Sequence, residues 1–304
     1  MELINNKKVA VIIPVHNRRD TTLECLERIY SQMICEWADI IVVDDGSKDG
    51  TGDAIAERFG EVVLLNGNGN LWWAGGINAG MRYAHKSGYD FFFWLNDDCR
   101  PQPGTLEKMA DFCRKSGGIC SALSVTPSGY SYGGFIKTLW GLKRIDHGSC
   151  DTFGGNCVCF PSSVINAIGY LDAECFPMDP ADADYGLRAK KAGFTVCALE
   201  EAICENDDNL SAGKKSWLFS DVPLKSYLKN FFKNRYHISY IPTYFRFRIK
   251  HWGVAGFLNA SWFYFRFLIY AFIRIMVPRN LLLRLSGRSS AWNKEAHYLS
   301  DETH

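Results

Sequence analysis

The sequence lacks the motifs that mark several common classes of nucleotide- and metal-binding protein. It contains no Walker lysine motif and no G-x-G-x-x-G segment, which disfavours dinucleotide binding of the Rossmann type. It also has no Cys-x-x-Cys pair, and its eleven cysteines, from Cys25 to Cys204, are irregularly spaced. An odd number of unpatterned cysteines indicates reduced, buried thiols rather than a zinc site or a disulfide framework.

Long uninterrupted apolar runs are also missing. The N-terminal run ends at Pro14 after about seven residues, which is short for a signal peptide and predicts a cytoplasmic protein. The apolar segment 252–277 is interrupted by Arg266 and Arg274, and each would be costly at the middle of a bilayer. Their spacing places them on similar sides of a helix, as in a helix that lies in the membrane interface.

Acidic residues are absent from Val222 to Lys294, a segment that holds thirteen of the 34 Lys and Arg residues. The remainder therefore has 34 − 13 = 21 basic against 33 acidic residues. Such asymmetry favours an anionic partner, and the 18 aromatic residues between Tyr227 and Trp292 favour a membrane surface. Anionic lipid would contribute about 1 kcal/mol per cation. The alternative is a set of helices packed on the rest of the protein with a solvated basic face. We see no nucleic-acid-binding module.

What the sequence does contain, at 304 residues and 47% hydrophobic content, is enough apolar surface for a large core. Short β-branched or aromatic runs alternate with segments of helical periodicity over the first 100 residues. Strands are predicted at 8–15, 38–47, 61–66 and 91–96, with helices at 23–33, 51–59 and 75–86. Further helices are predicted at 161–169 and 182–192, with a strand at 194–199. This alternation predicts a doubly wound α/β sheet.

Polar or glycine-rich sequence follows each of the first four predicted strands. In an open α/β sheet, ligands bind at the carboxyl ends of the strands. The segments at these ends are 14–20, 44–51, 66–80 and 96–99. Each alone is explained by a turn or a helix cap, but four at one edge favour a binding site.

Five short segments together resemble the family 2 glycosyltransferases, which have the GT-A fold. They are IIPVHNR, VVDDGSKDGT, GNLWWAGGINAG, LNDDC and DADYGLRAKKAGF, in that order within residues 8–210. The resemblance is to the bacterial rhamnosyltransferase and galactofuranosyltransferase branch. It implies an inverting, metal-dependent transfer from a dTDP- or UDP-sugar to a glycan or lipid-linked acceptor. The implied pathway is synthesis of a bacterial surface polysaccharide such as O-antigen or capsule.

The resemblance also implies a division of the chain. Residues 1–220 would form the GT-A catalytic domain, with a nucleotide-binding half at about 1–100 and an acceptor-binding half at about 101–220. The basic and aromatic composition of residues 221–304, which lie outside the resemblance, predicts a helical region that associates with the inner face of the cytoplasmic membrane.

A metal site is implied at Asn96-Asp97-Asp98, where the family usually has Asp-x-Asp. Asp98 would be the main ligand of Mg²⁺ or Mn²⁺, with Asp97 near the metal or the ribose. Many relatives have a histidine after a later strand, whereas this chain has Glu205, Asp207 and Asp208 there, with Glu205 as a possible third ligand. Either a carboxylate replaces the histidine or the metal site is looser than usual. The alternative for the two carboxylates is a helix cap.

The remaining implied site residues bind donor or acceptor. Donor-binding residues would be Pro14, Val15, Asn17, Arg18, Asp44, Asp45, Asn70, Gly75, Gly76, Asn78 and Asp97. Acceptor-binding residues would be Trp72, Trp73, Gly155 and Asp184. Trp72 and Trp73 are adjacent on a segment expected to be irregular, so one of them is available to stack on a sugar.

The catalytic base implied by the resemblance is Asp182, which would deprotonate the acceptor hydroxyl. Asp184 and Arg188 are four residues apart on the predicted helix and should pair, which leaves Asp182 available. The alternative is that Asp182 only caps this helix.

Two other functions are compatible with the sequence. A nucleotidyltransferase that makes sugar nucleotides also uses aspartates on an α/β sheet, although it usually has a basic, glycine-rich segment after strand one. A non-catalytic sugar-nucleotide-binding protein would explain Asn96, the missing histidine, and Ala181 where the family has glutamate.

Overall fold

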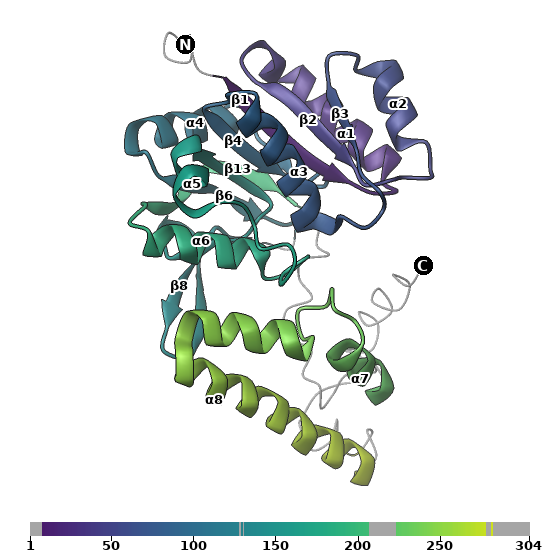
Figure 1. Ribbon diagram of the computed structural model, residues 1–304, viewed down its shortest axis with the longest axis vertical. Coiled ribbons are helices and arrows are strands. Elements are labelled where there is room, and N and C mark those ends of the chain that lie inside the picture. Colours follow the sequence, from purple (N-terminus) through teal and green to yellow (C-terminus); the bar gives the residue numbers. More distant parts are fainter. Residues whose placement is uncertain (1–7, 128, 130, 207–222, 278–280, 282–304) are drawn as a thin grey trace. The chain divides into compact units, whose positions relative to one another are not determined.

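The computed structural model describes residues 8–127, 129, 131–206, 223–277 and 281 (Figure 1). The chain divides into two compact units, Met1–Leu210 and Ser211–His304. We describe each unit by itself.

The first unit is built on a mixed sheet with the strand order β10-β13-β6-β12-β4-β1-β2-β3. In chain order these strands are β1 (Val9–Val15), β2 (Asp39–Asp44), β3 (Val63–Asn66), β4 (Phe91–Leu95), β6 (Ile119–Val125), β10 (Gly148–Ser149), β12 (Cys157–Pro161) and β13 (Val196–Glu205). Two short strands extend it, with β5 (Arg100–Pro101) beside β13 and β7 (Ser131–Tyr132) beside β6. The first four strands are parallel, whereas β12 runs antiparallel between β4 and β6.

Alternating strand residues face two helical layers, because successive side chains on a strand point to opposite faces. One layer is α1 (Arg19–Ser31), α2 (Thr51–Arg58) and α4 (Thr105–Ser116), which share a core with Val9, Val11 and Ile13. On the opposite face, Gly80 of α3 (Trp72–Lys86) approaches Ile12, and Tyr185 of α6 (Ala181–Lys191) packs on Trp94. Helix α5 (Ser162–Ile168) contacts α6 and β12 (Figure 1). The predicted doubly wound α/β fold is thus confirmed.

The sheet reverses its strand order between β1 and β4. From β1 the chain builds outward through β2 and β3, and it then returns to add β4 on the other side of β1. Ligands of doubly wound sheets bind at such a switch point, outside the carboxyl ends of the strands. The residues that follow Val15 and Leu95 therefore occupy the expected position of the binding site.

Helix α3 begins at Trp72, three residues before the predicted start, and a short 3₁₀ turn (Ile34–Glu36) follows α1. The expectation that Trp72 and Trp73 lie on an irregular segment is therefore wrong. The sequence did not indicate the first turn of α3, because it is followed by Gly75 and Gly76 and glycine has poor intrinsic helix propensity. Strand β13 likewise extends to Glu205, six residues past the predicted end at 199, after an irregularity in its pairing between Leu199 and Ile203.

A second, three-stranded sheet has the order β11-β8-β9. It consists of β8 (Gly134–Thr138), β9 (Gly141–Ile145) and β11 (Thr152–Phe153). Strands β8 and β9 form an antiparallel hairpin whose two-residue turn is Leu139-Trp140. Strand β11 is held to α6, since Thr152 Oγ1 donates to the carbonyl of Ala183 at 3.0 Å.

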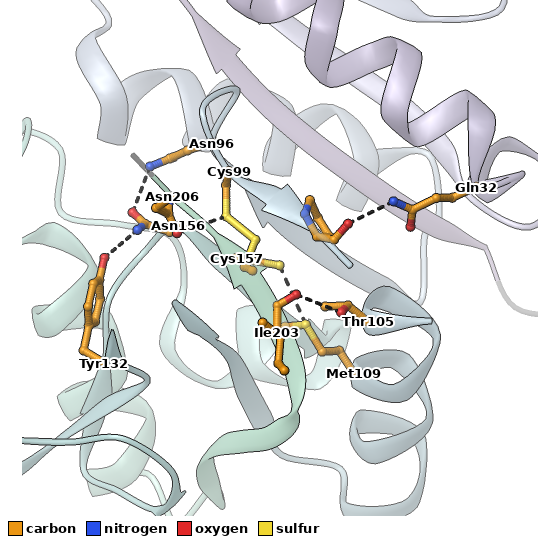
Figure 2. Close-up of a disulfide and its surroundings, with 12 residues drawn as sticks. Gln32, Asn96, Cys99, Thr105, Met109, Tyr132, Asn156, Cys157, Ile203 and Asn206 are labelled. Carbon is orange, nitrogen blue, oxygen red and sulfur yellow. Dashed lines mark hydrogen bonds between the residues drawn. A yellow bond between two sulfur atoms is a disulfide. The ribbon is translucent and has the colours of Figure 1, made fainter. Parts of the chain in front are cut away.

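One cysteine pair differs from the sequence expectation. Cys99 and Cys204 form a disulfide, with a Cα–Cα distance of 6.1 Å (Figure 2). The expectation that the cysteines are all reduced is wrong for these two, which are 105 residues apart. They meet because β5, directly after Cys99, pairs antiparallel with the end of β13. The other nine cysteines remain thiols.

The second unit contains α7 (Leu224–Phe232) and α8 (Ile241–Met276), and α8 has non-helical backbone at Gly253. The two helices pack through aromatic side chains, including Phe231 against Tyr264 and Phe267. The rest of α8 carries many exposed apolar side chains, among them Val254, Phe257, Leu258, Trp262, Phe265, Leu268, Phe272 and Ile275. Among the residues described, no helix combines the length and apolarity needed to cross a membrane.

Candidate active site

The two carboxylates after β4 contact a guanidinium that follows β1. Arg18 Nη1 lies 3.3 Å from Asp97 Oδ1, and Arg18 Nη2 lies 3.1 Å from Asp98 Oδ2. Thr22 Oγ1 donates a further hydrogen bond to Asp97 Oδ2 at 3.1 Å. Burial raises the pKa of Asp97 to about 6, against the opposing effect of Arg18. Arg18 therefore offsets the repulsion between two adjacent acids at the switch point.

The carboxylates at this switch point suit a metal cation that also binds a diphosphate, rather than a cation bound by protein side chains alone. The Asp98 side chain is 37% exposed, whereas that of Asp97 is 4% exposed. Among residues 8–127, 129, 131–206, 223–277 and 281, no three His, Cys, Asp or Glu side chains form a group that could hold a metal. Glu205, the predicted third ligand, instead accepts a hydrogen bond from Gln102 at 3.1 Å. Mg²⁺ commonly uses one or two carboxylates together with substrate phosphates and water, so Asp98 fits this role.

Asn96 is part of a hydrogen-bond chain that explains why an amide stands where the family usually has aspartate. Trp73 Nε1 donates to Asn96 Oδ1 at 2.8 Å, and Asn96 Nδ2 donates to Asn156 Oδ1 at 3.1 Å. Asn156 in turn donates to the hydroxyl of Tyr132 (Figure 2). Asn96 must therefore accept on one side and donate on the other, and an ionised carboxylate cannot donate.

We predict that Asn96→Asp destabilises the protein, although it restores the usual family triplet. The new carboxylate would face Asn156 Oδ1, and a third acid would stand beside Asp97. A partly buried polar group left without its partner costs about 1–3 kcal/mol. Thermal or urea unfolding would measure this loss, with the exposed Asn70→Asp as the control. An Asn96→Asp protein as stable as the wild type would contradict the role given to this chain.

Asp45, predicted to bind the donor, holds the loop after β3. Its Oδ1 accepts from the backbone N–H of Gly69 at 2.8 Å. Its Oδ2 accepts from the N–H groups of Leu71 at 2.8 Å and Trp72 at 3.0 Å. Asp45 is buried, so both of its oxygens serve this loop and the first turn of α3. The loop is thereby fixed at the carboxyl edge of the sheet.

The loops after β1 and β2 are joined by similar contacts. Asp44 Oδ1 accepts from Ser47 N at 2.8 Å, and Asn17 Oδ1 accepts from Lys48 N at 2.7 Å. The N–H of Asn17 donates to Ser47 Oγ at 2.8 Å. The two strand ends that carry Asn17 and Asp44 are therefore brought together, because the side chains of Asn17 and Ser47 each bond the backbone of the other loop.

The other predicted donor residues lie in different environments. A side chain at Gly76 would come within 3.0 Å of Pro14, so α3 and the end of β1 are in close contact there. Gly75 is on the first turn of α3, and Asn70 is exposed. Val15 is the last residue of β1, where its carbonyl accepts from Asp45 N. Asn78 is buried and makes hydrogen bonds to both the N–H and the carbonyl of Leu171. This structural use of Asn78 was not predicted.

Asp182 lies on the first turn of α6 and is only partly buried. Its Oδ2 accepts from the N–H of Gly155 at 2.7 Å, and its Oδ1 accepts from the N–H of Ala183 at 2.7 Å. Burial, followed by the nearby Asp179 carboxylate, raises the pKa of Asp182 to about 7 despite these two hydrogen bonds. A carboxyl group with a pKa near 7 suits proton transfer at neutral pH.

Gly155 brings Trp73 and Asp182 together. A methyl group on Gly155 would lie 2.7 Å from the Trp73 ring and 3.1 Å from Asp182 Cβ. Only glycine leaves this space, so three of the predicted site residues share one location. Trp72, by contrast, is 38% exposed and has a positive φ of 59°. The sequence did not reveal the contributions of Tyr132 and Asn156, which come from a segment without a readable motif.

The carboxylate of Asp184 is not available at the location shared by Trp73, Gly155 and Asp182. It is fully buried, and Arg188 Nε donates to its Oδ2 at 2.8 Å. The predicted pairing of Asp184 with Arg188 is confirmed. Its predicted contact with an acceptor conflicts with this burial, because the carboxylate has no exposed surface.

Comparison with known proteins agrees with this fold. The structure of a mannosyltransferase from Pyrobaculum calidifontis in complex with GDP-Man and Mn²⁺ matches with a TM-score of 0.56 at 14% identity, covering 92% of this chain and 79% of that one. The structure of GalNAc-T7 with UDP, GalNAc and Mn²⁺ also has a TM-score of 0.56, at 11% identity, covering 66% of this chain and 44% of that one. These likenesses define the class as an α/β protein with the GT-A glycosyltransferase fold.

Sequence comparison identifies the family. Residues 10–159 match the profile described as glycosyl transferase family 2. An undecaprenyl-phosphate mannosyltransferase of Micrococcus luteus is 31% identical over 110 residues, which are 35% of this chain and 44% of that protein. An uncharacterized protein of Mycobacterium tuberculosis is 24% identical over 205 residues, or 63% of this chain and 71% of its own length. The chain belongs to glycosyltransferase family 2, although it spans less than half of the Micrococcus protein.

Proposed function

We propose that this protein is an inverting glycosyltransferase. It would transfer a sugar from a nucleoside-diphosphate donor, a dTDP- or UDP-sugar, to a glycan or lipid-linked acceptor. The product would belong to a bacterial surface polysaccharide such as O-antigen or capsule, as in the rhamnosyltransferase-like branch. The Micrococcus relative, by its name, acts on an undecaprenyl-phosphate acceptor, which supports the lipid-linked class.

The observation that carries this proposal is the placement of Asp182. Its carboxylate is partly exposed, is oriented by two backbone N–H groups, and lies beside Gly155 and the Trp73 ring. As general base it would accept the proton of the acceptor hydroxyl as that oxygen attacks the anomeric carbon of the donor. The indole of Trp73, fixed by Asn96, offers an apolar surface that limits how the sugar can lie against this carboxylate.

The donor would bind along the carboxyl edge of β1, β2 and β4. The loops held by Asp44, Asp45 and Asn17 lie at this edge, and Arg18 offers a cation for a diphosphate. Asp98 would hold Mg²⁺ or Mn²⁺, with Asp97 behind it. When bound, such a cation supplies charge neutralisation at the diphosphate leaving group. The two solved relatives contain Mn²⁺ together with UDP or GDP-Man.

The second unit supports a peripheral position on the inner face of the cytoplasmic membrane. Helix α8 exposes a series of large apolar side chains and carries Arg266 and Arg274. An interfacial helix buries such side chains while its arginines extend to the lipid headgroups. This position would bring the enzyme to a lipid-linked acceptor.

Incubation of the protein with UDP-, dTDP- and GDP-sugars, each with Mg²⁺, Mn²⁺ or a chelator, would test the proposed activity. Slow release of nucleoside diphosphate from one donor, stimulated by a divalent cation, is the expected result. Pyrophosphate release from a nucleoside triphosphate would instead favour a nucleotidyltransferase. Nucleotide binding without turnover of any donor would favour a non-catalytic binding protein.

The raised pKa of Asp182 predicts the pH dependence of transfer. The base must be deprotonated to act, so activity is lost as the pH falls through about 7, the pKa of this group. An ordinary aspartate would move this loss to near pH 3.8. The dependence of kcat/KM on pH, measured with the donor found in the screen, should therefore decline about tenfold per pH unit on its acid side. A level profile from pH 5 to pH 8 would contradict the assignment.

A further inference from the structure

Three residues connect β11 to β12, and they lie between the two halves of the candidate site. They are Gly154, Gly155 and Asn156. Glycine has more backbone freedom than any other residue, so a segment that begins with two glycines does not fix its own conformation. The contacts that hold this segment must therefore come from its neighbours, and among its three residues only Asn156 has a side chain with which to make them.

One neighbour is the strand end that carries the two acids. The carbonyl of Asn156 accepts from the N–H of Asn96 at 2.9 Å, which extends the pairing of β12 with β4 by one residue. The side chain adds a second bond to the same residue, since Asn156 Oδ1 accepts from Asn96 Nδ2 at 3.1 Å. Asn96 directly precedes Asp97 and Asp98. Asn156 is thus bonded twice to the residue from which the carboxylate pair begins.

The other neighbour is the proposed base. The N–H of Gly155 donates to Asp182 Oδ2 at 2.7 Å, and a methyl group on Gly155 would lie 3.1 Å from Asp182 Cβ. The Tyr132 ring covers the preceding glycine, because a methyl group on Gly154 would lie 2.7 Å from Tyr132 Cε2. The hydroxyl of Tyr132 accepts from Asn156 Nδ2 (Figure 2). Two consecutive residues, Gly155 and Asn156, therefore connect Asp182 with Asn96.

We propose that Asn156, held by Tyr132, is a positioning residue that keeps the proposed base in register with the carboxylates at the metal position. An inverting transfer needs the acceptor oxygen and the leaving diphosphate on opposite sides of the anomeric carbon. The distance between the groups that hold them must therefore be fixed, and a displacement of about 1 Å can lower the rate about 100-fold. This role rests on the proposed function and deepens it, because Asn156 would act through Gly155 and Asn96.

Asn156→Ala should lower kcat for sugar transfer about 10–100-fold while the KM for the donor changes little, because the donor residues keep their contacts. The pH profile should also move, which a general loss of stability would not cause. The Gly155 N–H favours the ionised form of Asp182, so weakening this bond raises the pKa of Asp182 above about 7. The acid-side decline of kcat/KM should therefore begin at a higher pH than in the wild type. Asp179, the other carboxylate that acts on Asp182, is unchanged in this variant.

Tyr132→Phe removes the acceptor of Asn156 Nδ2 while keeping the ring over Gly154, and it should produce the same changes to a smaller degree. Tyr132→Phe/Asn156→Ala should be close to Asn156→Ala alone, because Tyr132 acts through Asn156. Asn166→Ala is the matched control, since Asn166 is an exposed asparagine of α5 that also bonds a side chain, His85 Nε2, at 3.0 Å. It should leave kcat and the pH profile unchanged. Fully additive losses in the double variant, or an unshifted profile in Asn156→Ala, would overturn the proposed role.

The pKa of Asp182 can also be measured without turnover. NMR titration of protein labelled with carbon-13 in its aspartate carboxyl groups gives this pKa, with Asp182→Asn to assign the signal. A higher pKa in Asn156→Ala supports the positioning role even if no sugar is transferred, in which case only the proposed function fails. Transfer that requires Asp182 but is unaffected by Asn156→Ala, together with an unchanged pKa, would overturn the positioning role alone.

Discussion

Replacement of Asp182 by asparagine should lower kcat for sugar transfer by about 10²–10⁴-fold, the usual contribution of a general base. Asparagine has nearly the same shape, but its amide cannot accept a proton from the acceptor at neutral pH. Donor affinity should change little, because the donor residues lie at the ends of β1, β2 and β4. The measurements are steady-state turnover and calorimetric titration with the donor.

The asparagine variant also loses one local hydrogen bond. Asp182 uses both oxygens, one for Gly155 N and one for Ala183 N, and an amide keeps only one acceptor oxygen. Thermal unfolding must therefore be measured alongside turnover. Asp53→Asn is a matched control, since Asp53 is also in the first turn of a helix but is exposed. Full turnover in Asp182→Asn would remove Asp182 as the base, and a parallel loss in Asp53→Asn would point to a general effect on folding.

Replacement of Arg188 by leucine should destabilise the folded protein by about 3–5 kcal/mol, as expected when a buried carboxylate loses its partner. Arg188 Nε donates to Asp184, while Nη1 and Nη2 donate to the carbonyls of Ile168 at 2.6 Å and Tyr170 at 2.8 Å. Arg188 thus fastens the segment after α5 to α6. Urea unfolding would measure the change in the free energy of unfolding.

A surface pair of the same spacing provides the control. Arg28 pairs with Glu24 on α1 at 2.8 Å, and both side chains are about half exposed. Arg28→Leu should cost less than about 1 kcal/mol, because water screens this pair. Asp184→Leu/Arg188→Leu should recover part of the loss by removing the unpaired charge. Equal costs for Arg188→Leu and Arg28→Leu would show that burial of the Asp184 pair has no energetic importance.

The sequence predicted the first half of the fold well because its signals are local. Each early strand is a short β-branched or aromatic run, and each helix has apolar residues at three- and four-residue spacing. The order of the strands is a different matter. That β12 inserts antiparallel between β4 and β6 depends on pairings such as Phe160 with Phe92, which no local pattern specifies.

The candidate site was likewise predictable where its signals are local and not where they depend on long-range contacts. The motif residues were identifiable because polar residues follow buried strands. Their partners were not, since Arg18 lies 80 residues from Asp98 and Asn156 lies 60 from Asn96. From the sequence, Asn96 stands where the family usually has a carboxylate. The structure explains the amide, because Asn96 accepts from Trp73 and donates to Asn156. Asp45 likewise looked like a ligand contact, although three backbone N–H groups already occupy it.

The pairing of β13 with β6 defines when this protein can finish folding during synthesis. The family match ends at residue 159, but β6 still needs β13, whose last residue is Glu205. When β12 has just emerged from the ribosome, the edge of β6 that later pairs with β13 has no neighbouring strand. An unpaired strand edge is prone to aggregation. Because β12 ends at Pro161, the ribosome must add about 44 more residues (205 − 161) before β13 is complete. The smallest segment able to fold independently thus extends well past the region that identifies the family.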